Sequence, residues 1–190
     1  MASRDILFCG DPVLRKKAKR VSEITDGILQ LLDDMAQTMI EAPGLGLAAP
    51  QVGESVRAIV CREDATDEAE VLCLLNPRVV RTEGEVEAIE GCLSLPTLQG
   101  LVTRSELVVV EAMTPAGEIR RIEAGEMLAR ALQHEIDHLN GVLFLDRVDE
   151  DTLGWMIPDE DEEDGYRLEP ATVQEVLDRF EQMRKRKERG

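Results

Sequence analysis

The only two histidines of the chain stand four residues apart, in the segment QHEIDHLNG. On an α-helix, residues at i and i+4 lie on one face about 6 Å apart, so His134 and His138 can point a ring nitrogen at the same ion. Glu135 lies about 100° round the helix from His134. A glutamate placed there can reach a water beside the ion and act as a general base. The pattern H-E-x-x-H therefore predicts a helix that carries a metal site.

The third ligand distinguishes a metal centre from two histidines that merely share the surface of a helix. No histidine follows His138, so a downstream ligand has to be a carboxylate such as Asp146, Asp149 or Glu150. Such a site, with Glu135 as the base, is typical of a zinc peptidase. This interpretation stays open on the sequence.

A cysteine upstream is the other candidate. Cys92, in EGCLSLP, follows Gly91, which permits unusual backbone angles, and Pro96 makes the exit from the segment rigid. The other three cysteines are expected to serve packing: Cys9, Cys61 and Cys73. A set of Cys92, His134 and His138 leaves one coordination position open for water, which is the arrangement of a catalytic metal site.

Apolar periodicity predicts an α+β fold, with antiparallel β-strands packed around the central metal-binding helix and with an N-terminal and a C-terminal helix. Helices are expected at about 22–42, 125–140 and 171–187. Strands are expected at 56–61, 71–75, 78–80, 101–113, 118–124 and 142–148. The turn sequence TPAG indicates a hairpin between 101–113 and 118–124. Gly141 is expected to form a left-handed cap at the C-terminal end of the central helix.

The formal charge of −17 is unevenly distributed. Ten acidic residues and one basic residue between Asp149 and Glu169 give a local charge of −9. We expect a catalytic domain over 1–148, a solvated acidic loop over 149–170 and a C-terminal helix with a basic tail over 171–190. Binding of a basic partner is the alternative for the acidic stretch. A chain this negative is not expected to bind DNA.

The localisation expected from the sequence is the cytoplasm. The cysteines show no close pair, the N-terminal segment lacks an apolar stretch for export, and no apolar run approaches the length of a membrane span. An Arg/Ser-rich leader is also missing, which favours a bacterial protein over an organellar one.

Three segments together resemble the signature motifs of the peptide deformylases: GLGLAAPQVG (44–53), EGCLSLP (90–96) and QHEIDHL (133–139). They stand in the family's order at comparable spacing, and the resemblance covers roughly residues 1–148. It implies removal of the formyl group from the N-terminal formyl-methionine of nascent polypeptides. The implied mechanism is attack of a metal-bound hydroxide on the formyl carbon, with a glutamate as general acid and base.

The resemblance also implies a role for each motif residue. The implied metal ligands are Cys92, His134 and His138. Glu135 would be the general acid and base, Gln51 and the Leu93 backbone N–H would contact the oxyanion, and Gly46 would offer backbone hydrogen bonds to the peptide. The implied ion is Fe²⁺, although one thiolate and two imidazoles suit Zn²⁺, Co²⁺ or Ni²⁺ about equally.

A narrow apolar pocket beside the metal is needed to select methionine. Leu45, Met127 and Ala131 are the expected walls, because the latter two share the histidine face of the helix; ordinary core packing is the alternative. The family resemblance, together with the tendency of metal ligands to be held by neighbouring groups, implies that Glu90 and Arg104 form a charged pair that positions the metal-binding strand.

Three further features concern the surroundings of the site. Asp137 is expected to be an ordinary surface charge of the helix. Gln99 stands where some family members place an arginine able to contact the peptide, so peptide affinity is expected to differ here. The basic end, Arg184 to Arg189, either complements the helix dipole or contacts ribosomal RNA near the peptide exit.

A non-catalytic metal-binding or peptide-binding module is the alternative to an enzyme.

Overall fold

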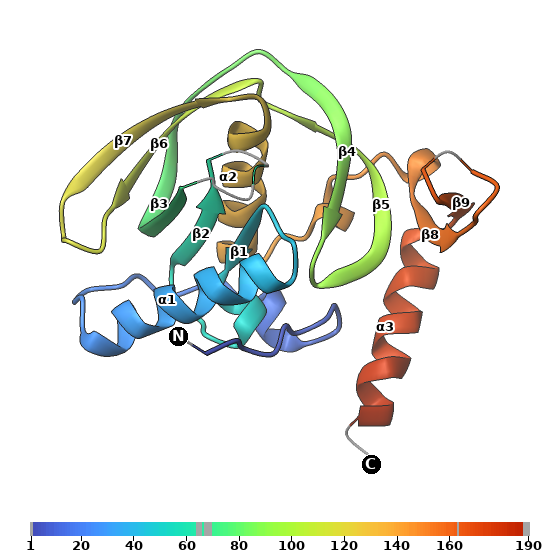
Figure 1. Cartoon of the computed structure of the whole chain (residues 1–190), viewed down its shortest axis with the longest axis horizontal. Coiled ribbons are helices and arrows are strands. Elements are labelled where there is room, and N and C mark those ends of the chain that lie inside the picture. Colours follow the sequence, from blue (N-terminus) through green and yellow to red (C-terminus); the bar gives the residue numbers. More distant parts are fainter. Residues whose placement is uncertain (1, 64–65, 67–69, 163, 188–190) are drawn as a thin grey trace.

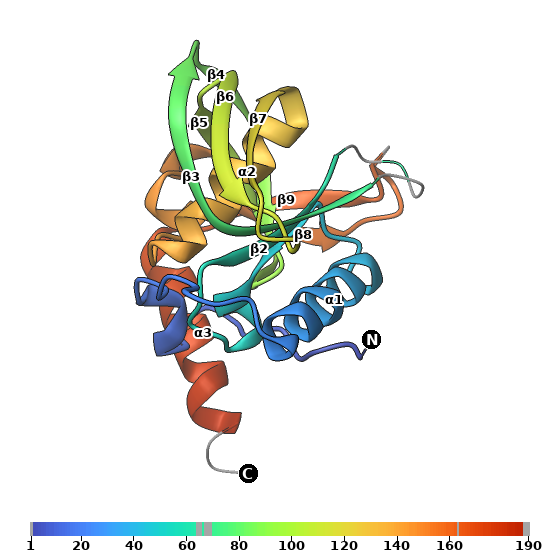
Figure 2. The same cartoon turned by 90° about the vertical axis from the view of Figure 1, so that its left-hand side faces the viewer.

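Helix α2 (Glu126–Leu139) lies between two antiparallel β-sheets (Figure 1). This arrangement comes from a computed structural model that describes residues 2–63, 66, 70–162 and 164–187. Helix α1 (Asp26–Glu41) packs on the outside of the first sheet, and α3 (Val173–Lys187) projects from the body of the molecule (Figure 2). The predicted α+β fold, with a central, an N-terminal and a C-terminal helix, is confirmed.

The two sheets differ in what they support. The first has the strand order β1-β2-β3-β6-β7, with bounds Gly46–Ala48, Ala58–Arg62, Val71–Glu83, Leu107–Met113 and Ile119–Gly125. The second has the order β4-β5-β8-β9, with bounds Val86–Cys92, Leu95–Arg104, Gly154–Pro158 and Tyr166–Pro170. The first sheet packs on α2 and α1, and the second supplies the cysteine that faces α2.

Strand β2 shows why the first sheet can carry a helix on each face. Successive side chains of a strand point to opposite faces. Ile59 and Cys61 accordingly join the apolar cluster that contains the buried side of α2, whereas Ala58 and Val60 join the cluster that contains α1. All four are fully buried, so α2 is held against a rigid support.

The end of α2 follows the prediction. Asn140 is the C-cap, and Gly141 has a φ of 77°, in the left-handed region. A Cβ at Gly141 would lie 2.7 Å from the backbone oxygen of Arg15, so glycine is needed there both for its backbone angle and for the space.

The single strand expected over 101–113 is wrong. Strand β5 ends at Arg104 in one sheet, and β6 begins at Leu107 in the other. The side-chain amide of Gln133 accepts a hydrogen bond from the Ser105 N–H (3.1 Å) and donates one to the Ser105 carbonyl (2.9 Å). The break therefore depends on a residue of α2 that is remote in sequence. The predicted β6–β7 hairpin is confirmed.

The strand expected over 142–148 is also wrong. Phe144–Asp146 form a 3-10 helix, and the Asp146 carboxylate accepts the Leu143 N–H at 2.8 Å. Phe144 and Leu145 are buried in an apolar cluster, and the only strand-like contact found in this segment is an isolated bridge between Val148 and Val102. The apolar run thus reflects burial, which a strand and a short helix satisfy equally.

The acidic loop expected over 149–170 is mostly a β-hairpin. Strands β8 and β9 pair from Gly154↔Pro170 to Pro158↔Tyr166, and β8 also pairs with β5. Trp155 holds the hairpin on the body, because it is buried against Phe180 of α3 with ring centroids 6.1 Å apart. The segment between the two strands includes Asp159, Glu160, Asp161, Glu162 and Asp164.

The C-terminal helix α3 packs on the body through Val176 and Phe180, which are buried with residues of β5 and the 3-10 helix at 144–146. Of the predicted basic tail, residues 188–190 lie outside the described residues. None of the helices in the described part of the chain combines the length and the apolar character needed to cross a membrane.

Candidate metal centre

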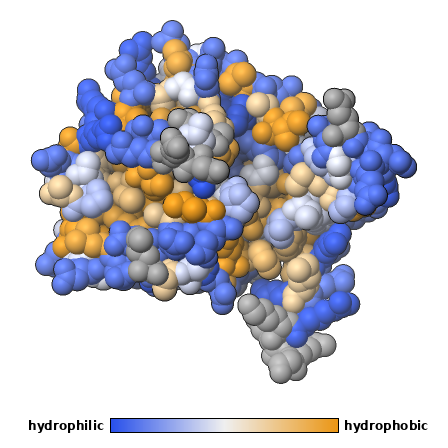
Figure 3. All heavy atoms as spheres, viewed as in Figure 1, coloured by the Kyte–Doolittle hydropathy of each residue, from blue (hydrophilic) through white to orange (hydrophobic). Residues whose placement is uncertain are grey.

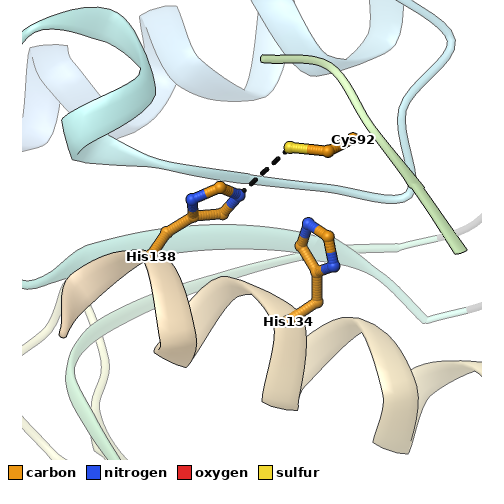
Figure 4. A group of neighbouring side chains, drawn as sticks. All are labelled: Cys92, His134 and His138. Carbon is orange, nitrogen blue, oxygen red and sulfur yellow. Dashed lines mark hydrogen bonds between the residues drawn. The ribbon is translucent and has the colours of Figure 1, made fainter. Parts of the chain in front are cut away.

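Cys92, His134 and His138 converge at the interface between β4 and α2 (Figure 4). Their ligand atoms all lie within 4.8 Å of one another, and Cys92 Sγ is 3.3 Å from His138 Nε2. No other group of three such atoms occurs among the described residues. One thiolate and two imidazoles at this separation fit a divalent transition metal such as zinc or iron.

The carboxylates that follow His138 in the sequence are not grouped with Cys92, His134 and His138. Asp146 is in contact with Arg15 at 2.5 Å and with the Leu143 N–H. Asp149 caps the short helix at 150–152 through the Asp151 N–H. The structure therefore brings the histidine pair together with the cysteine and not with an acidic residue from the following segment.

His134 is oriented by Glu90. The Nδ1 of His134 lies 2.9 Å from Glu90 Oε2, and with the proton on Nδ1 the other nitrogen, Nε2, is free to bind a metal. Burial raises the pKa of Glu90, but hydrogen bonds from Arg104 and His134 outweigh it and hold that pKa well below its usual range. Glu90 therefore remains a carboxylate. The expected pair of Glu90 and Arg104 is present, with two bonds of 2.8 and 2.9 Å.

Asp137 belongs to the same buried network, so the expectation of a surface charge is wrong. It is 8% exposed and accepts a hydrogen bond from Arg104 Nη1 at 2.5 Å. Arg147 donates two further hydrogen bonds to it, at 2.6 and 2.8 Å. Arg130 adds a bond of 2.7 Å to Glu90. The positive charges of these guanidinium groups offset the negative charges of the carboxylates that surround the histidine ligands.

Glu135 is buried beside the three ligands. Its Oε2 atom is buried and has no hydrogen-bond partner among the described residues. Burial raises the pKa of Glu135 to about 7, and the neighbouring carboxylates of Glu90 and Asp137 add to the increase. A carboxyl group with this pKa can both accept and donate a proton near neutral pH.

Gly46 determines how closely β1 approaches this glutamate. A Cβ at Gly46 would lie 2.5 Å from Glu135 Oε1 and 2.7 Å from its Cγ. Only a glycine allows the backbone of β1 to lie against Glu135, because any side chain would overlap with the carboxyl group.

Gln51 places an amide beside the thiol. Its Oε1 accepts the Ala48 N–H at 2.8 Å, which leaves Nε2 to face Cys92 Sγ at 3.6 Å and Ser94 Oγ at 3.2 Å. The side chain is 1% exposed. An N–H donor is therefore held next to the metal ligands, and Leu93 follows Cys92 in the same wall.

A cavity of about 450 Å³ opens beside His134. Its lining includes the predicted residues Leu45, Gly46, Gln51, Cys92, Leu93, Met127, Ala131, His134 and Glu135. His138 is buried behind them, with 1% exposed. On the face of the molecule that Figure 1 views, Figure 3 shows apolar side chains gathered in a hollow across the middle and hydrophilic side chains along its rim.

The sequence motifs did not predict some of the residues that line the cavity. No sequence pattern indicated Ile89 or Arg130, although both line the cavity together with residues of the motifs. Met156 of β8 also lines the cavity, and because it lies outside every motif no local signal could have indicated it.

Comparisons with known proteins agree with this geometry. The family model described as Polypeptide deformylase matches residues 3–153. A peptide deformylase of Natranaerobius thermophilus is 52% identical over 151 residues, which are 79% of this chain and 95% of that protein.

Solved structures show the same fold. A peptide deformylase from Synechococcus elongatus, in complex with actinonin, has a TM-score of 0.75 and 46% identity over 78% of this chain and 82% of that one. A peptide deformylase from Legionella pneumophila has a TM-score of 0.77 and 36% identity over 97% of this chain and 99% of that one. Because the family match spans all three motifs and every residue of the metal centre, ending just before β8, this chain belongs to the peptide deformylase family of enzymes.

Proposed function

We propose that this enzyme removes the formyl group from the N-terminal formyl-methionine of nascent polypeptides, and that it does so with a divalent metal ion bound by Cys92, His134 and His138. One observation supports this most directly: the three ligands converge beside a buried glutamate whose Oε2 has no partner among the described residues, and Cys92, His134 and this glutamate line an apolar cavity. The family relationship supports the same reaction.

A formamide is a resonance-stabilised carbonyl with a poor leaving group, so its hydrolysis needs a strong nucleophile and a proton for the departing nitrogen. A divalent ion held by Cys92, His134 and His138, Fe²⁺ by family resemblance or Zn²⁺, Co²⁺ or Ni²⁺ by ligand chemistry, would supply the strong nucleophile, because such an ion lowers the pKa of a bound water to about 7.

Glu135 is the proposed general acid and base. It accepts a proton from the water and transfers it to the amine nitrogen as the C–N bond breaks, so that the products are formate and a free N-terminal amine. The pKa of about 7 that burial gives this carboxyl group suits both steps near neutral pH.

Gln51 and Leu93 are the proposed oxyanion donors. The Nε2 of Gln51 is held near the thiol because Oε1 is already occupied by the Ala48 N–H. The backbone N–H of Leu93 is the second proposed donor. Loss of one such donor typically costs about 10²–10³ in rate.

The substrate peptide is proposed to bind along β1. This strand stands at the edge of its sheet in the described chain, so the backbone of Gly46 can add hydrogen bonds to an extended peptide. Leu45, Met127 and Ala131 line the same cavity and are the proposed walls of the methionine pocket.

The test is release of formate from a short formyl-methionyl peptide by protein loaded anaerobically with Fe²⁺. Glu135→Ala should abolish release while the metal stays bound. Cys92→Ala distinguishes the alternative metallopeptidase, which would keep its metal and cleave peptide bonds. Formate release that is unaffected by Glu135→Ala would contradict the proposed mechanism.

The site of action is proposed to be the cytoplasm of a bacterium, near the ribosome. Arg184 to Arg189, of which residues 188 and 189 lie outside the described residues, would contact ribosomal RNA at the peptide exit. Co-sedimentation with ribosomes by the intact chain, lost when residues 184–190 are removed, would support this contact, and no co-sedimentation by the intact chain would exclude it.

A further inference from the structure

The β8–β9 hairpin contributes to the same cavity as the metal centre. Strand β8 pairs with β5 at Leu98↔Trp155 and Gln99↔Gly154, so it extends the sheet that carries Cys92. Met156, the next residue of β8, lines the cavity. This hairpin lies beyond the segment that the family model matches.

Burial of Trp155 determines the direction of Met156. Trp155 is 8% exposed and packs against Phe180, and the guanidinium carbon of Arg179 lies 4.3 Å from the centre of its ring. Neighbouring residues of a strand point to opposite faces, so Met156 is turned away from α3 and toward the cavity. The hairpin is tied down further where the Ala171 N–H donates to the Leu153 carbonyl at 2.9 Å.

Gln99 of β5, which pairs with Gly154 of the hairpin, is bound to the hairpin through its side chain as well. Gln99 Nε2 donates to the Tyr166 hydroxyl of β9 at 3.3 Å. Gln99 does not line the cavity, and of the described residues of β8 and β9 only Met156 does, so the side chain that the hairpin presents there is a thioether.

We propose that Met156 is a specificity-determining residue that contacts the nascent peptide beyond formyl-methionine and favours an apolar side chain there. This inference rests on the proposed function. A cavity of about 450 Å³ has the size of a site for a ligand larger than one side chain. Methionine is unbranched and polarisable, so it can adapt to apolar groups of different shape.

The experiment compares formyl-methionine amide with formyl-Met-Leu-Leu and formyl-Met-Lys-Lys peptides. Met156→Ala should raise KM for the leucine peptide about five- to tenfold more than KM for formyl-methionine amide, with kcat for the two substrates changing alike. The preference for leucine over lysine should fall by a similar factor. Met156→Leu should retain most of the preference for leucine, because leucine is an apolar side chain of similar volume.

Controls separate contact from folding. Met183→Ala removes an exposed methionine of α3 that does not line the cavity and should leave the KM ratio unchanged. Met156→Gln keeps the length of the side chain and should lose the leucine preference without a large change in melting temperature. An unchanged KM ratio and preference in Met156→Ala and Met156→Gln would overturn this inference alone. Absence of formate release from all three substrates by the unmodified enzyme would overturn the proposed function with it.

Discussion

Arg104 binds Glu90 through two parallel hydrogen bonds of 2.8 and 2.9 Å, at the same carboxylate that lies 2.9 Å from His134 Nδ1. The guanidinium group thus holds the carboxylate that orients a metal ligand. Both partners are almost fully buried, at 5% and 6% exposed, so neither charge can be compensated by solvent if the other is removed.

Arg104→Ala should therefore destabilise the fold and weaken metal binding. Breaking a buried ion pair by removing one partner typically costs about 3–5 kcal/mol. Arg104→Lys should recover little, because a lysine cannot form the two parallel bonds. Urea unfolding and metal analysis measure both effects. Arg81→Ala, which removes an exposed pair with Glu83, is the matched control, and unchanged metal content in Arg104→Ala would refute the positioning role.

Gly46→Ala should lower activity without unfolding the protein. The added methyl group would overlap with the Glu135 carboxyl, which must then move, and a displacement of about 1 Å in a catalytic group can cost about 10²-fold in rate. Formate release is the measurement. Gly27→Ala is the control, because the nearest atom to its Cβ is 3.6 Å away, and it should keep full activity. Equal rates in both variants would show that Gly46 need not be a glycine.

Metal removal should lower the melting temperature. An ion that binds the folded state alone stabilises it by about 2.7 kcal/mol at a concentration one hundred times its Kd. For a chain of this size that corresponds to about 5–10 °C. Thermal melts before and after chelation, and after reloading with Fe²⁺ or Zn²⁺, measure the shift. Cys92→Ser should show a much smaller shift, whereas an equal shift would place the ion elsewhere.

Acid should remove a stabilising contribution of Asp34. A hydrogen bond from the Ala2 N–H, with others from Gln30 and Arg4, lowers the pKa of this carboxyl group. A lowered folded-state pKa stabilises the fold above the unfolded value of about 4, and that stability is lost as the pH falls through the folded value. Asp34→Asn should therefore melt lower than the unmodified protein at pH 7, and the gap should narrow below about pH 4.

The matched control for this pH dependence is Asp33→Asn, at the neighbouring exposed position of α1. It should leave the melting temperature nearly unchanged at both pH values. A gap for Asp34→Asn that stays constant from pH 7 to pH 3 would show that the carboxylate charge contributes nothing.

Elements that depend on local spacing agree well between sequence and structure. Helix α2 and its cap at Gly141 follow from periodicity and from a glycine in a position that needs one. The pair of His134 and His138 follows from a four-residue separation that any α-helix turns into a shared face. By contrast, the run 101–113 divides between two sheets because Gln133 of α2 binds Ser105.

The sequence by itself determined the ligand pair, the neighbouring glutamate and the α+β class, because these depend on residues a few positions apart. Only the tertiary structure decided that Asp137 is buried between Arg104 and Arg147, and that Met156 reaches the cavity from a segment interpreted as an acidic loop. The physical reason is that burial and charge pairing between distant segments depend on how the sheets and helices pack, and no local spacing encodes that packing.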